Sequence, residues 1–222
     1  TAAFLGDFLL HTGQVKEART QVELALRDEP DLGIGHLQRG RLLVAEGRRN
    51  EASSALAEAR RLTPHDALVE YYFGTLASPP EADVAAREGA LRSAIRLDPA
   101  FASARDALAR LLLEEQRSPD EALGLAMAAV RLDPGSVSYR LTVLELESRM
   151  GCAAEAERDE QALVRIASLR GGALSEVIRH YESVDRLEEA EAFLRQVQAR
   201  NRRNIRAAQR LASFLERHDR PN

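Results

Sequence analysis

The sequence IRLDPA at residues 95–100 returns as VRLDPG at residues 130–135. Two earlier stretches have the same design: RDEP ends at Pro30 and RRLTP ends at Pro64. The four prolines follow one another at intervals of 34, 35 and 35 residues. A fixed period of this length indicates a tandem array of small structural units. The hydrophobic pattern continues at the same period after the last of these prolines, so the array extends toward the C-terminus.

Each unit contains two helical patterns. Apolar residues recur at spacings of three and four, which places them on one face of a helix. Gly13, Gly47 and Gly151 separate the two patterns in their units, because glycine can adopt the left-handed conformation that ends a helix. The proline then stops the second helix, since it has no N–H to donate and disfavours helical geometry in the residue before it. The sequence therefore predicts an all-α protein made of helix pairs.

Composition and charge argue against several function classes. The 31 basic and 35 acidic side chains give a formal net charge of -4, which weighs against a nucleic-acid partner, because such binding needs concentrated positive charge. A single cysteine, Cys152, permits no internal disulfide and no multi-cysteine metal site. No apolar run approaches the roughly 20 residues that cross a bilayer. We expect a protein without membrane insertion, soluble in the cytoplasm or the periplasm.

With this period and these helix pairs, the chain resembles the tetratricopeptide repeat (TPR) family, whose 34-residue helix-turn-helix units stack into a right-handed superhelical solenoid. The resemblance spans the chain and implies a single array of six units with a C-terminal capping helix at 205–218. The start, TAAFLGDFLLHTG, has no initiator Met, so we expect the array to be a piece of a longer protein. The units are 1–32, 33–66, 67–101, 102–136, 137–170 and 171–204. An irregular helical bundle and an RNA-reading array of 35-residue helical units are the alternative folds.

The family places small residues where the two helices of a unit cross. The matching residues are Gly6, Gly40, Gly74, Ala109 and Ala212 on first helices and Ala18, Ala52, Ala122, Ala156 and Ala190 on second helices. Bulky residues fill the space between units: Leu5, Leu9, Leu43, Phe73, Leu91, Leu108, Leu112, Val143, Val177, Tyr181, Leu194, Leu211 and Leu215. Arg39, Arg87 and Glu160 depart from the pattern. The capping helix needs a polar outer face, which is supplied by Arg206, Gln209, Arg210, Ser213, Glu216 and Arg217.

The resemblance also implies a binding groove lined by the first helix of each pair. The candidate groove residues are Ile34, Leu37, Gln38, Arg41, Leu68, Tyr71, Tyr72, Thr75, Asp106, Arg110, Leu141, Glu145 and Arg179. Tyrosine and arginine dominate interface energies, so a protein or peptide partner is expected near Tyr71, Tyr72 and Arg41. The alternative is that both tyrosines pack against neighbouring helices with their hydroxyls in water. The Lys and Asn residues that grip a C-terminal carboxylate in chaperone-binding members are absent.

No pattern in the chain predicts catalysis. The five histidines are scattered without the helical spacing of a metal site, and no cofactor is expected. Gly171 and Gly172 follow no predicted strand, so they indicate a hinge between units rather than a phosphate loop. The leading hypothesis is a non-catalytic interaction scaffold, such as a component of a bacterial multiprotein complex. The alternative is the repeat region of a larger enzyme, for example a hydrolase. Self-association through Leu5, Phe8 and Leu9 at the N-terminal end is a third possibility.

Charge is distributed unevenly near the C-terminus. From Arg195 to Arg220 there are eight arginines and two acids, whereas residues 182–191 carry five acids and one arginine. One explanation is that neighbouring helices neutralise each other, with little energy from each exposed pair. The other is a surface for an acidic partner, formed by Arg195, Arg202, Arg203, Arg206 and Arg210.

Overall fold

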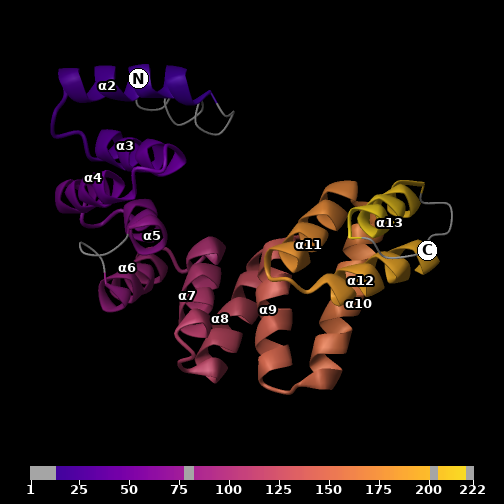
Figure 1. The fold of residues 1–222 in the computed structure, drawn as a ribbon. Coiled ribbons are helices and arrows are strands. Elements are labelled where there is room, and N and C mark those ends of the chain that lie inside the picture. Colours follow the sequence, from indigo (N-terminus) through magenta and orange to yellow (C-terminus); the bar gives the residue numbers. More distant parts are fainter. Residues whose placement is uncertain (1–13, 78–82, 201–204, 219–222) are drawn as a thin grey trace. The chain divides into compact units, whose positions relative to one another are not determined.

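The computed structural model describes residues 14–77, 83–200 and 205–218, and these residues form helices and no strand. Contacts between residues divide the chain into two compact units, residues 1–111 and 112–222. Unit 1 contains α2 (Val15–Asp28), α3 (Gly33–Ala45), α4 (Arg49–Leu62), α5 (Ala67–Leu76) and α6 (Val84–Leu97), and the boundary lies within α7 (Ala102–Glu114). Unit 2 continues with α8 (Pro119–Leu132), α9 (Val137–Arg149), α10 (Ala153–Leu169), α11 (Gly171–Ser183), α12 (Leu187–Arg200) and α13 (Ile205–Arg217) (Figure 1). The all-α prediction is confirmed.

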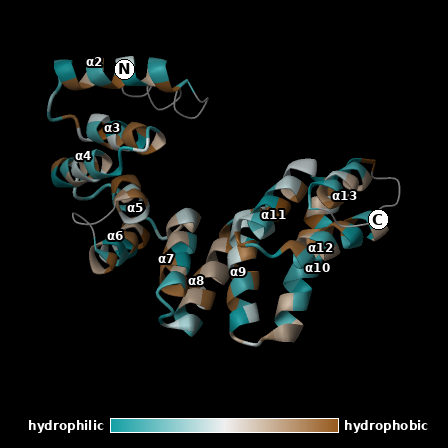
Figure 2. Cartoon of the chain, in the orientation of Figure 1, coloured by the Kyte–Doolittle hydropathy of each residue, from teal (hydrophilic) through white to brown (hydrophobic). Residues whose placement is uncertain are grey.

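Every predicted segment from residue 33 to residue 204 contains two helices. Within unit 1, α3 packs against α4 and α5 against α6, and within unit 2, α9 packs against α10 and α11 against α12. First helices of neighbouring pairs also touch, namely α3 with α5, α9 with α11 and α11 with α13. Most helices carry both hydrophilic and hydrophobic residues (Figure 2), as expected for helices that bury one face against a neighbour.

The predicted crossing points are confirmed at two glycines of unit 1. A Cβ atom on Gly40 would lie 2.7 Å from Leu56 Cγ, and one on Gly74 would lie 2.6 Å from Leu91 Cγ. Neither position has room for a side chain. Arg87, which departs from the family pattern near the second crossing, donates from Nε to the carbonyl oxygen of Gly74 at 3.1 Å. The arginine therefore ties the two helices of its pair together.

The predicted bulky residues of the described chain, Leu43 to Leu215 in the list above, are all buried. In unit 1 one core cluster includes Leu56, Val69 and Phe73 from α4 and α5. In unit 2 a larger cluster runs from Val137 to Leu215 and includes Phe193 and Phe214. The six polar residues predicted for the outer face of α13 are exposed, and its opposite face is buried, so the amphipathic character predicted for this helix is confirmed.

Four turns between the helices of a pair share one backbone geometry. In each turn the N–H that follows a residue with positive φ donates at 2.9 Å to the carbonyl five residues before it, and the turn between α7 and α8 has a second positive φ at Ser118 (46°). The shared arrangement is the Schellman closure of a helix end. The left-handed residues of these closures are Gly47 (φ 76°), Gln116 (φ 52°), Gly151 (φ 74°) and Asp185 (φ 57°). The prediction for the two glycines is confirmed, and the repeat imposes the same geometry on glutamine and aspartate.

One prediction about the backbone is wrong. Gly171 and Gly172 do not form a hinge loop, because α11 begins at Gly171 and only Arg170 separates it from α10. Glycine has low helix propensity, but the core formed by Ala173, Leu174 and Val177 holds this end of α11 in place.

Candidate partner-binding surface

The surface predicted for a partner lies on α3 and α5 in unit 1. Arg41 on α3 places its guanidinium 4.7 Å from the ring centre of Tyr72 on α5. Its Nη1 also donates at 2.8 Å to the side-chain oxygen of Gln38. Gln38 is 2% exposed, so its amide holds the arginine from the protein side. We call Arg41, Tyr71, Tyr72 and Phe101 the aromatic–arginine cluster.

The aromatic rings extend this cluster toward the start of α7. The ring centres of Tyr71 and Tyr72 are 5.2 Å apart in an edge-to-face arrangement, and those of Tyr71 and Phe101 are 5.0 Å apart. These separations are typical of favourable aromatic pairs. Tyr71, Tyr72, Arg41 and Phe101 are all half-buried. Tyr72 also packs against the core of unit 1. The rings are therefore fixed by packing and keep part of their surface exposed.

The other residues predicted for the groove in unit 1 have different surroundings. Leu68 is 39% exposed, Ile34 is half-buried against the core, and the Thr75 hydroxyl donates to the Tyr71 carbonyl at 2.9 Å. On α7, the exposed Arg110 donates from Nε at 3.1 Å to the buried Asp106 carboxylate. Arg110 therefore offers a guanidinium at the surface, whereas the Asp106 carboxylate is buried and does not reach the surface.

Two of the leucines predicted for the groove are corrected by the structure. Leu37 is fully buried in the core of unit 1, and Leu141 is 5% exposed within the core of unit 2. Each lies on a first helix that contacts another first helix of its own unit. A side chain between two such helices is covered, and the two leucines therefore offer no surface to a partner.

In unit 2, Glu145 is engaged in ion pairs. Its carboxylate accepts from Arg149 Nε at 2.7 Å and from Arg186 Nη1 at 2.9 Å. The Arg186 guanidinium also lies 5.5 Å from the ring centre of Tyr181. Burial is the main cause that raises the pKa of the Tyr181 hydroxyl to about 12. Arg179 is exposed on α11.

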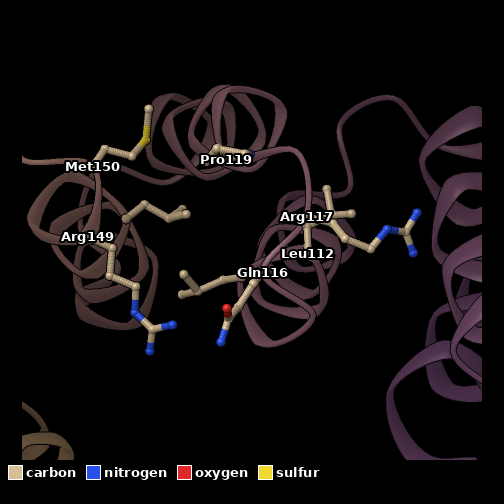
Figure 3. Close-up of a pocket in the computed structure, with 8 residues that line it drawn as sticks. Leu112, Gln116, Arg117, Pro119, Arg149 and Met150 are labelled. Atoms are coloured by element: carbon tan, nitrogen blue, oxygen red, sulfur yellow. The ribbon is translucent and has the colours of Figure 1, made fainter.

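An apolar notch of about 470 Å³ lies in unit 2 between the last turn of α7, the first turn of α8 and the end of α9. Its lining consists of Leu112, Leu113, Gln116, Arg117, Pro119, Leu146, Arg149 and Met150. Figure 3 shows Gln116 and Arg149 pointing toward the same side, with Arg117 turned away from them. This lining contains no carboxylate, imidazole, hydroxyl or thiol.

Two kinds of feature have no candidate among the described residues, and some predicted residues fall outside the described ranges. Among the residues that the structure describes, no group of His, Cys, Asp and Glu is arranged to hold a metal ion, and no helix is long and apolar enough to cross a membrane. The predicted self-association residues Leu5, Phe8 and Leu9 lie outside the described ranges, as do Arg202 and Arg203. Phe101, the last residue of the predicted unit 67–101, was not among the residues predicted for the groove.

No protein-family model matches the chain. The TPR repeat-containing protein PA4667 of Pseudomonas aeruginosa is 30% identical to it over 161 residues, which are 72% of this chain. The chain spans 27% of the length of that relative.

Solved structures show the same fold at lower sequence identity. PilF of Pseudomonas aeruginosa is 16% identical and aligns over 96% of each chain with a TM-score of 0.69. PilW, a type IV pilus biogenesis factor, is 14% identical and aligns over 95% of this chain and 96% of its own, with a TM-score of 0.70. Cut9, from the APC/C hetero-tetramer Cut9–Hcn1, is 15% identical over 96% of this chain and 42% of its own, with a TM-score of 0.66. The repeat period, the paired helices and these relatives identify the chain as a member of the tetratricopeptide-repeat family.

Proposed function

We propose that this chain is a non-catalytic interaction module that holds a segment of a partner protein against α3 and α5. The observation that carries the proposal is the aromatic–arginine cluster, in which Arg41 is stacked on the half-exposed Tyr72. Tyrosine and arginine are enriched among the residues that contribute most to protein–protein affinity. A partner that covers Tyr72 and Arg41 would bury aromatic area and receive guanidinium hydrogen bonds together.

The cluster is held in place before any partner arrives. Gln38 fixes Arg41 from one side, while Phe101 and Tyr72 fix the Tyr71 ring. Binding loses less side-chain entropy when the contacting groups are already ordered. The surface can therefore bind a short partner segment that makes only a few contacts with it.

The comparisons support the same class of function. One fold neighbour, Cut9, is described within a hetero-tetramer with Hcn1, and another, PilW, as a biogenesis factor. Neither description is of an enzyme. In this chain the aromatic–arginine cluster contains no carboxylate, imidazole or thiol that could activate a tyrosine hydroxyl, and we infer that it recognises a partner rather than transforms one.

The test begins with a photo-cross-linking amino acid at position 68, because Leu68 is the exposed apolar residue beside the cluster. The cross-linked partner segment is sequenced, synthesised and titrated calorimetrically against purified protein. We expect the Arg41→Gln/Tyr72→Ala variant to bind about tenfold more weakly or worse, since each interface hot spot contributes on the order of 1–2 kcal/mol. Circular dichroism checks that the variant keeps its helices.

Arg39→Gln is the matched control. Arg39 is exposed two residues before Arg41 on the same helix, so the affinity of this variant should stay within about twofold of the parent. Equal affinity for all three proteins would exclude this surface as the partner site.

A further inference from the structure

A second surface in unit 2 has the composition of a binding site for an acidic ligand. A cleft of about 320 Å³ lies between α11 and α13, which contact each other (Figure 1). Its lining consists of Gly171, Leu174, Ser175, Arg206, Gln209, Arg210 and Ser213. Two of these side chains are cationic and none is acidic, so the cleft has a net positive charge. We call it the α11–α13 cleft.

The two arginines of this cleft differ from Arg195 and Arg217. Arg195 pairs with Glu191, and Arg217 pairs with Glu182. Arg210 instead donates at 2.7 Å to the neutral hydroxyl of Ser175. Among the described residues, neither Arg206 nor Arg210 forms an ion pair. Neutralisation between helices, one of the two predictions for this region, therefore accounts for Arg217, and Arg195 is neutralised within α12. Neither pair compensates the charge of the cleft.

Two exposed apolar residues are close in the chain to residues that line the same cleft. Leu169 is 87% exposed and Ile205 is 71% exposed, the highest values among the large hydrophobic residues that the structure describes. They precede the cleft residues Gly171 and Arg206 closely in the chain. A Cβ atom on Gly171 would lie 3.3 Å from Arg206 Nη1, so the starts of α11 and α13 lie side by side. A ligand in the cleft could cover this apolar surface while it neutralises the arginines.

The backbone of α11 adds to the positive potential at this end. No side chain caps its N-terminus, and the first N–H groups of a helix carry partial positive charge. Gly171 and Gly172 have no side chains that would shield these groups. The backbone therefore adds to the positive electrostatic potential that Arg206 and Arg210 produce in the cleft.

We infer that the α11–α13 cleft binds a short acidic segment of a partner protein. Carboxylates of the segment pair with Arg206 and Arg210, and an aliphatic side chain beside them covers Leu169 and Ile205. The exposed leucine and isoleucine favour a peptide over a nucleic acid, because phosphate backbones gain nothing from aliphatic surface and no aromatic ring lines the cleft for a base to stack on. This site is separate from the aromatic–arginine cluster of unit 1 and does not depend on the function proposed for it.

The probe is a fluorescein-labelled peptide with four repeats of Glu-Glu-Leu, titrated by anisotropy at low and physiological salt. We expect saturable binding to the parent protein that weakens as salt rises. Arg206→Gln/Arg210→Gln should weaken it about tenfold or more, because it removes the cations of the cleft. Leu169→Ser/Ile205→Ser should weaken binding of the peptide several-fold, because one or two buried aliphatic contacts are lost. A probe with serine in place of leucine should bind the parent protein more weakly for the same reason.

Two further variants make the result specific. Arg158→Gln/Arg165→Gln removes the same amount of charge from exposed positions on α10 and should leave the affinity nearly unchanged, as should Arg41→Gln/Tyr72→Ala in unit 1. A failure of the function proposed for unit 1 would thus be distinguishable from a failure here. The inference is overturned if the peptide does not bind, if the α10 variant loses as much affinity as the cleft variant, or if a twelve-nucleotide oligothymidine binds this cleft more tightly than the peptide.

Discussion

Five described residues have left-handed backbone, yet only Gly47 and Gly151 are glycines. A side chain at positive φ destabilises the folded chain by about 1 kcal/mol or more. Gln116→Gly and Asp185→Gly should therefore each raise the free energy of unfolding by roughly 0.5–1 kcal/mol, after the added flexibility of glycine in the unfolded chain is subtracted. Urea denaturation monitored by circular dichroism measures the change.

Gly151→Ala is the control in the opposite direction, because it adds a side chain at a left-handed position instead of removing one. A Cβ atom there would meet no atom within 4 Å, so any loss comes from the backbone conformation alone. We expect a loss of about 1 kcal/mol. Stabilisation by Gly151→Ala, or destabilisation by Gln116→Gly, would show that these turns do not hold the left-handed geometry in solution.

Glu147 occupies a position in α9 where the repeat would place an apolar side chain, one period after the buried Leu112. It is 3% exposed. Burial, followed by the carboxylates of Asp159 and Glu155, raises its pKa to about 7, and Arg158 opposes the shift. Because the folded protein holds this proton more tightly than the unfolded chain, the carboxyl group contributes no penalty below pH 4.5, a growing penalty up to pH 7, and a constant one above.

The free energy of unfolding should consequently fall as pH rises from about 4.5 to 7. Glu147→Gln should remove that decrease and stabilise the protein at pH 8, by at most about 3 kcal/mol, the value that corresponds to the full shift. Urea titrations at pH 4.5, 6 and 8 compare it with Glu157→Gln, an exposed control on α10. The idea fails if the pH dependence of Glu147→Gln matches that of the parent.

At the scale of a helix pair, two glycines of α5 and α6 have opposite roles. A Cβ atom on Gly74 would collide with Leu91 and approach the Arg87 carbonyl to 3.0 Å, whereas one on Gly89 would meet nothing within 4 Å. Gly74→Ala should destabilise the protein by about 1–3 kcal/mol because the two helices must separate. Gly89→Ala should stabilise it by about 0.5–1 kcal/mol, since alanine favours the helix.

Thermal denaturation of these two variants tests whether the close crossing exists. Both variants replace glycine by alanine in neighbouring helices, so the effect of the substitution on the entropy of the unfolded chain is the same and cancels in the comparison. Equal effects of Gly74→Ala and Gly89→Ala would mean that α5 and α6 do not approach at Gly74.

The helix pairs could be predicted from the sequence because the period, the prolines and the turn glycines all depend on local backbone preferences. The start of α11 could not, since Gly171 and Gly172 disfavour a helix locally and are held in one by tertiary packing. For the candidate site, the residue types of Tyr71, Tyr72 and Arg41 indicated a surface. The burial of Leu37 and Leu141 depends instead on how closely neighbouring first helices approach, which spacing along one helix does not specify.

The α11–α13 cleft was only partly foreseeable for the same reason. The excess of arginine near the C-terminus is visible in the sequence, but which arginines find an acidic partner depends on where each side chain meets another helix. Glu191 lies one turn before Arg195 on the same helix, whereas Ser175 meets Arg210 from a different one. Contacts within a helix follow from spacing, and contacts between helices require the packed structure.

At the scale of the whole molecule, most contacts lie inside one of two units. In repeat proteins each element is stabilised chiefly by its neighbours, so a local defect need not unfold the distant part of the chain. Phe193→Ala removes a fully buried ring from the core of unit 2 and should destabilise it by about 3–5 kcal/mol. We expect faster amide hydrogen exchange in α9 to α13 and little change in α3 to α6.

Phe73→Ala is the reciprocal variant, because Phe73 is buried in the core of unit 1. It should accelerate exchange in α3 to α6 and spare α9 to α13. Mass spectrometry of proteolytic fragments, performed where exchange reports opening rather than intrinsic chemistry, locates each effect. If either variant accelerated exchange equally along the chain, the two units would unfold as one cooperative body, and the stability changes argued above for unit 1 and unit 2 would each have to be assigned to the whole array.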